Sequence, residues 1–193
     1  NSFQSTMEKE VRTIQNLIKR TNEESRMVEG TAIVFNSLSQ DMGFYETIDP
    51  SAIDAETIAN SDIFAYLNHD ENRGVLARSR YGKGSLTLSI EDDGLHYSFI
   101  APQTALGDEL LSYLSRGEIT TSSFAFTVAP NGDTWEKKSD GNVYRTITKI
   151  NRLYDVSPVF EPAYLATECV KRKLDEFNTQ EKLNALKEKI KAL

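Results

Sequence analysis

Histidine is scarce in this chain of 193 residues, so any reaction that needs an imidazole is restricted to His69 and His96. His69 follows an apolar run that ends at Leu67 and opens a polar stretch, a strand-end position where functional side chains are commonly presented. His96 lies among alternating apolar residues, which is typical of a half-exposed structural histidine. The pattern favours His69 for chemistry, although an ordinary loop histidine also fits it.

Four consecutive hydroxyl residues end at Ser123 and lead directly into an apolar strand. Because alternate side chains of a strand face opposite ways, Phe124 and Phe126 share one face while Ser123 and Ala125 share the other. We expect the aromatic face to be buried and the face of Ser123 to have room for a substrate backbone. Ser123 is therefore a better nucleophile candidate than Ser122, and a Ser/Thr-rich turn without chemistry is the alternative interpretation.

A serine hydroxyl becomes an effective nucleophile when a positioned base removes its proton, and histidine is the usual base. His69 could serve Ser123 in this way if folding brings the two together. An acidic group must then orient the imidazole. Asp155 stands in an apolar, strand-like run, where a charge is unfavourable without a partner, and Glu161 is the less constrained alternative.

Most of the segments that must position these residues are predicted to be strands. Runs rich in β-branched and aromatic residues predict strands over 28–35, 63–67, 124–128 and parts of 143–159. Alternation on both sides of Asp93-Gly94 predicts a hairpin over 86–99. Helical spacing and capping residues predict a short helix after Asp54, a helix over 104–116 and a helical tail beyond Pro162.

Composition restricts the class of protein. A 39% hydrophobic chain of this length fits one main globular domain. The 22 Lys and Arg residues against 29 Asp and Glu give a net charge of −7, which opposes binding to phosphate, so we expect no nucleic-acid partner. No apolar run is long enough to span a bilayer, so no membrane partner is expected. The single cysteine, Cys169, cannot form an internal disulfide and suits a reducing compartment.

A series of short motifs follows in chain order over residues 8–168. They include Val28-Glu29-Gly30-Thr31-Ala32-Ile33-Val34-Phe35, Leu67-Asn68-His69-Asp70, Val75-Leu76-Ala77-Arg78, Ser123-Phe124-Ala125-Phe126 and Asp155-Val156-Ser157-Pro158-Val159. Together they resemble the prohead maturation proteases of tailed bacteriophages, the caudoviral prohead serine protease family.

The resemblance implies a serine endopeptidase of the α+β class, mainly β, with a herpesvirus-protease-like β-barrel surrounded by helices. Such enzymes lie inside the phage prohead in the bacterial host cytoplasm. There they remove the scaffolding segment of the major capsid protein and process themselves. The family motifs assign the nucleophile to Ser123, the base to His69 and the acidic third member to Asp155, with no cofactor and no metal.

Two departures from the family pattern concern the site. Ala125 replaces a glycine that usually follows the Ser-Phe pair, and Asp155 stands where glutamate is more frequent. Herpesvirus proteases use a second histidine as third member, which makes His96 an alternative. His96 precedes Ser123 in the chain, and that order favours Asp155. The same analogy extends to homodimer formation.

Three further expectations follow. Residues 1–7 are interpreted as a tag remnant and a natural start at Met7, residues 8–168 as the protease domain and residues 169–193 as a helical tail. The apolar spacing of Leu183, Leu186, Ile190 and Leu193 predicts a packed helix face, on this domain, on a partner or on another copy. A non-enzymatic capsid-assembly or scaffold factor is the alternative function, and a cysteine protease acting through Cys169 is a weaker one.

Overall fold

The computed structural model describes residues 7–14, 18–22, 24–161 and 167–192. Strands dominate this part of the chain, which confirms the expected mainly β member of the α+β class. Its helices are α1 (Ala55–Ala59), α2 (Ala105–Ser115) and α3 (Glu168–Lys191), with 3-10 turns η1 (Pro50–Ala52) and η2 (Glu71–Arg73). Asp54 and Thr104 cap α1 and α2 by accepting hydrogen bonds from backbone N–H groups, which explains why these helices begin where they do.

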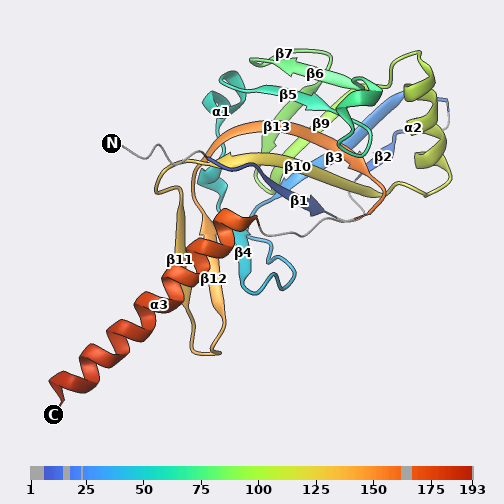
Figure 1. The fold of residues 1–193 in the computed structure, drawn as a ribbon. Helices are drawn as coiled ribbons and strands as arrows, with labels where there is room; N and C mark the ends of the chain where they lie inside the picture. The colour runs from blue at the N-terminus through green and yellow to red at the C-terminus, as the bar shows by residue number, and fades with distance from the viewer. Residues whose placement is uncertain (1–6, 15–17, 23, 162–166, 193) are drawn as a thin grey trace.

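The largest sheet carries the candidate nucleophile in its second strand. Its order is β1 (Glu10–Ile14), β10 (Thr121–Val128), β13 (Ile150–Val159), β5 (Asp62–Ala65), β6 (Ala77–Arg80) and β7 (Lys83–Gly84). β10 runs antiparallel to both of its neighbours, β1 and β13. Figure 1 shows the three strands lying side by side beneath β5 and β6. Every residue of β10 is buried, because neighbouring strands cover its edges and packed side chains cover its faces.

Two smaller sheets complete the strand arrangement. One has the order β2 (Ile18–Arg20), β3 (Met27–Val34), β9 (Gly94–Ile100) and β8 (Thr87–Glu91), so the hairpin predicted around Asp93-Gly94 is confirmed. The other has the order β11 (Asp133–Lys137), β12 (Val143–Ile147) and β4 (Tyr45–Ile48). The β-barrel that the resemblance implies is not found among the described residues, because their hydrogen-bonded ladders form three separate sheets and do not close.

One hydrophobic core joins the six-stranded sheet to the four-stranded one. Phe124 and Phe126 of β10 pack there with Val28 of β3 and Phe99 of β9. The expectation that the aromatic face of β10 is buried is therefore confirmed. Burial of this kind contributes roughly 1.5–3 kcal/mol for each large apolar side chain, before the cost of ordering the chain is subtracted.

Helix α3 packs through its first half only. Val170, Leu174 and Phe177 lie against Phe44 and Trp135, in a second small core on the β11–β12–β4 sheet. Beyond this point α3 extends away from the sheets (Figure 1).

The prediction that the second half of α3 packs on its own domain is wrong, because this part of the helix extends beyond the sheet that covers its first half. Leu183, Leu186 and Ile190 are 46%, 54% and 62% exposed, and Leu193 lies outside the described residues. The proposed division at residues 168 and 169 stays a prediction, as does the interpretation of residues 1–7, of which 1–6 lie outside the described part. In the described part, no helix has the length and apolar character that crossing a bilayer requires.

A buried ion cluster connects the three-stranded sheet to β1. The guanidinium of Arg145 on β12 lies 2.7 Å from Glu10 Oε2, 2.9 Å from Glu46 Oε2 and 2.8 Å from Asp133 Oδ2. Arg12 on β1 adds a contact of 2.7 Å to Glu46 Oε1. Burial opposes the charge of Arg145, but hydrogen bonds and the surrounding carboxylates outweigh it and raise the pKa of Arg145. Arg145 therefore stays charged, and each member of the cluster depends on its partners.

We expect Arg145→Met to lower the free energy of unfolding by about 3–5 kcal/mol, because three carboxylates would lose their shared cation in a buried place. Urea unfolding followed by circular dichroism measures the change. Lys187→Met, on the exposed part of α3, is the matched control and should change it little. An Arg145→Met chain as stable as the control would contradict the stabilising role of the cluster.

The cluster also predicts a pH dependence. Burial alone would raise the pKa of Asp133, but the charges of Arg145 and Lys173 outweigh it and lower that pKa. A carboxyl with a lowered pKa in the folded state stabilises the fold above its unfolded value of ~3.9, and this contribution disappears as the pH falls through the folded value. Asp133→Asn should therefore be less stable than the unchanged chain near pH 7, and this difference should shrink as the pH falls below ~3.9, as measured by urea unfolding.

Candidate active site

Ser123 lies near the start of β10, on the face opposite the aromatic core. Its register partners are Thr13 on β1 and Ser157 on β13. The neighbouring Ser122 points the other way, and its hydroxyl lies 2.8 Å from the hydroxyl of Tyr97 in the core. The prediction that Ser122 and Ser123 face opposite sides of β10 is confirmed. The expected open space beside Ser123 is wrong, since Ser123 is fully buried and β1 covers it.

His69 reaches Ser123 from a tight turn that follows β5. The backbone N–H of Asp70 donates to the carbonyl of Leu67 at 3.2 Å, which closes a four-residue turn. Its two central residues, Asn68 and His69, both have a positive φ, of 57° and 58°. Turns with this geometry favour asparagine, and histidine also tolerates it. The backbone N–H of Asn68 donates to the carbonyl of Pro158 at 2.8 Å, so the turn is attached to the end of β13.

The fold brings the three predicted site residues together. His69 Nε2 lies 2.7 Å from Ser123 Oγ. On the other side of the ring, His69 Nδ1 lies 2.6 Å from Asp155 Oδ1. An ionised carboxylate is only an acceptor, so Nδ1 carries the proton and Nε2 of the neutral ring is free to accept one from the serine. The side chains of His69 and Asp155 are 27% and 12% exposed, so only the imidazole has substantial access to solvent.

Ser157 holds the carboxylate of Asp155, a role that was not predicted. Its buried hydroxyl donates to Asp155 Oδ1 at 2.7 Å and accepts from the backbone N–H of Tyr66 at 3.2 Å. Ser157 and Asp155 stand two apart on β13 and therefore share a face. That spacing in the sequence is the signal that could have identified it.

The alternative residues are not the groups that contact Ser123 or His69 in the part of the chain that the structure describes. Glu161 is exposed, and Asp155 is the carboxylate beside His69. Cys169 lies in the first turn of helix α3. Among the described residues, no group of three or more His, Cys, Asp or Glu side chains could hold a metal ion.

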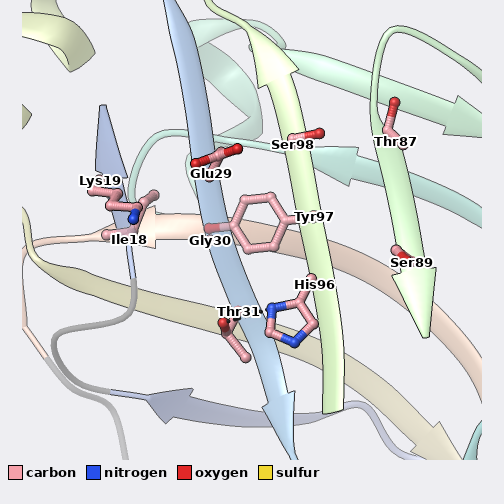
Figure 2. Close-up of a pocket in the computed structure, with 10 residues that line it drawn as sticks. All are labelled: Ile18, Lys19, Glu29, Gly30, Thr31, Thr87, Ser89, His96, Tyr97 and Ser98. Atoms are coloured by element: carbon pink, nitrogen blue, oxygen red, sulfur yellow. Dashed lines mark hydrogen bonds between the residues drawn. The ribbon is translucent and has the colours of Figure 1, made fainter. Parts of the chain in front are cut away.

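His96 belongs to a separate pocket on the outside of the four-stranded sheet. Its Nδ1 lies 3.0 Å from Thr31 Oγ1 and its Nε2 lies 2.8 Å from Asp93 Oδ1. Figure 2 shows the ring of His96 beside Thr31 among the residues that line this pocket, which has a volume of about 480 Å³. Both ring nitrogens are occupied away from Ser123, so His96 is not the group that contacts His69.

A serine, an imidazole and a carboxylate in hydrogen-bonded succession form the arrangement that serine hydrolases use to attack carbonyl groups. Comparison with known families gives the class more closely. A family described as caudovirus prohead serine protease matches residues 12–180, which is most of the chain. The chain belongs to this family and is a serine protease of the capsid-maturation class.

One similar solved structure is the bacteriophage T4 capsid assembly protease gp21, with 10% sequence identity and a TM-score of 0.48. The similarity covers 80% of this chain and 98% of that one. No curated protein sequence matches significantly.

The contact between Ser157 and Asp155 gives a testable prediction. Ser157→Ala should lower kcat by roughly 10–100-fold, because a hydrogen bond to a charged group is worth about 1.5–3 kcal/mol. KM should change little, since Ser157 is buried beneath the carboxylate. Steady-state kinetics on a peptide substrate measures both. Ser79→Ala, another buried strand serine on β6, is the matched control. An unchanged kcat in Ser157→Ala would exclude the positioning role.

Proposed function

We propose that this chain is the endopeptidase that cleaves the scaffolding segment from a major capsid protein, with Ser123, His69 and Asp155 as its catalytic residues. The observation that supports this assignment best is the continuous contact from Ser123 Oγ to His69 Nε2 and from His69 Nδ1 to Asp155 Oδ1. Family membership supplies the reaction class. It also favours an enzyme over a non-enzymatic assembly factor.

The proposed reaction is acyl transfer in two steps. Ser123 Oγ attacks the scissile carbonyl while His69 Nε2 takes the hydroxyl proton. His69 then delivers this proton to the leaving amine, which departs and leaves an acyl-enzyme. Water, deprotonated by His69, hydrolyses the ester and restores the serine. Asp155 keeps the ring in the Nδ1–H tautomer and stabilises the imidazolium that forms in each step. Backbone N–H groups would stabilise the oxyanion.

The place of action follows from the family. A prohead protease works inside the phage capsid in its host, where the scaffolding segment of the major capsid protein and the protease itself are the proposed substrates. The herpesvirus-protease-like arrangement belongs to the same proposal. Its support is a nucleophile strand flanked by the strand of the acid, together with a histidine that follows Asn68 in the neighbouring turn.

We expect Ser123→Ala to abolish cleavage of a capsid protein precursor that carries its scaffolding segment, because losing the nucleophile of a comparable triad lowers kcat by about 10⁶. His69→Ala should behave alike, whereas Asp155→Asn should keep more residual activity. Mass spectrometry of the fragments, after incubation of precursor with purified chain, is the measurement.

Two variants serve as controls for this prediction. Ser122→Ala changes the adjacent serine on the opposite face, and His96→Ala removes the other histidine. Both should still cleave the precursor. Cleavage that persists in Ser123→Ala, or that disappears in His96→Ala with the fold intact, would contradict the assignment.

A further inference from the structure

Strand β1 occupies the place beside the nucleophile where a substrate main chain would be expected. It pairs antiparallel with β10 and places Thr13 directly opposite Ser123. The carbonyl oxygen of Arg12 lies 3.0 Å from Ser123 Oγ. A carbonyl that is to be attacked must approach the nucleophile to about 3–3.5 Å, so the main chain of β1 fills that space.

The Arg12 carbonyl also interferes with proton transfer. A serine hydroxyl carries one proton, and two acceptors compete for that of Ser123, namely His69 Nε2 at 2.7 Å and Arg12 O at 3.0 Å. A hydroxyl that donates to Arg12 is not donating to its base. If it donates to His69 instead, two oxygen atoms face each other without a proton between them. Either arrangement is unfavourable for forming the alkoxide while β1 is in place.

The position of β1 in the sheet allows it to be exchanged. Among the residues that the structure describes it is an edge strand, and β10 is its one partner in the ladder. A hollow of about 220 Å³ lies beside it, lined by residues 12–14 and by the segment 37–40 among others. An extended peptide can add to the edge of a sheet through main-chain hydrogen bonds, with pockets that recognise alternate side chains. Removal of β1 would expose such an edge on β10, next to Ser123.

The ion cluster indicates which side chains this edge would accept. Glu10 contacts Arg145 at 2.7 Å, and Arg12 contacts Glu46 at 2.7 Å. These two residues bring one negative and one positive charge to the cluster. When β1 leaves, Arg145 and Lys173 remain with Glu46 and Asp133, and the formal charges still balance. A replacing strand restores every contact if it carries an acidic residue and, two residues later, a basic one.

We propose that the β10 edge beside Ser123 is a strand-addition site for an extended substrate peptide with an acidic residue two positions before a basic one, and that β1 is its resident occupant. The proposal rests on the assignment of Ser123 as nucleophile. It implies that β1 must be displaced before another peptide reaches the catalytic residues.

A reversible disulfide between β1 and β10 tests the proposal. Val11 and Ala125 are register partners, so Val11→Cys with Ala125→Cys in a Cys169→Ser background would join the two strands. Thr87→Cys with Ser98→Cys joins β8 to β9 in another sheet and is the matched control. The oxidised Val11–Ala125 pair should lose labelling of Ser123 by a fluorophosphonate probe, and reduction should restore it, while the control pair labels equally in both states. Labelling of Ser123 that is as strong in the oxidised Val11–Ala125 pair as in the reduced pair, and clearly present in both, would overturn the proposal.

Peptide binding provides a readout that does not need catalysis. A fluorescent peptide with the sequence of residues 8–14 is titrated against full chains carrying Ser123→Ala, followed by anisotropy. Adding Arg12→Ala weakens the resident strand and should increase affinity for the peptide, whereas Arg80→Ala, which changes an exposed residue at the end of β6, should not. The oxidised Val11–Ala125 pair should bind less peptide than its reduced form.

The two readouts separate failure of this inference from failure of the proposed function. Peptide that binds oxidised and reduced chains alike would overturn the strand-addition site, whatever the catalytic result. Peptide binding that the Val11–Ala125 disulfide weakens in the Ser123→Ala chain, together with no probe labelling of the reduced chain that keeps Ser123, would support the site and contradict the proposed nucleophile.

Discussion

The antiparallel register between β10 and β13 is the constraint on which the candidate site depends. It places Ser123 opposite Ser157 and Ala125 opposite Asp155, so that all four side chains lie on one face of the sheet. A slip of one residue would turn Ser123 into the hydrophobic core and bring Phe124 to the catalytic face. The small side chain at Ala125 also follows from this register, because the carboxylate of Asp155 stands beside it.

The base reaches this face through local backbone chemistry. β5 runs parallel to β13, with Phe64 opposite Asp155, and the chain then reverses within four residues. A reversal with two consecutive left-handed residues is unfavourable for most side chains, and asparagine is among those that tolerate it. The bond between Asn68 and Pro158 ties the reversal to the strand that carries the acid. Base and acid are therefore held by one connected piece of structure.

The candidate site residues and the elements with strong local periodicity could be predicted from the sequence. The elements that were missed depend on contacts between segments far apart in the chain. Ser123, His69 and Asp155 were identifiable because each combines a reactive side chain with a strand or strand-end position. The hairpin around Asp93-Gly94 and helix α2 carry strong local periodicity. β1 was missed because it is five residues long and contains two charged residues, whose burial depends on partners far along the chain. The second half of α3 has the spacing of a packed helix, but periodicity does not say whether a partner surface is present.

The hydrogen bond between the hydroxyls of Ser122 and Tyr97 limits the movement of the strand that carries the nucleophile. Burial raises the pKa of Tyr97, so this phenol stays protonated and links the nucleophile strand to the opposite sheet at any physiological pH. With Ser122 hydrogen-bonded to Tyr97 and its main chain paired along β13, β10 has little freedom to move as negative charge develops on Ser123 Oγ. Such preorganisation keeps the reorganisation cost of the chemical step small. The motions that accompany turnover are then expected in the peptide that enters and leaves, and not in the strand that attacks it.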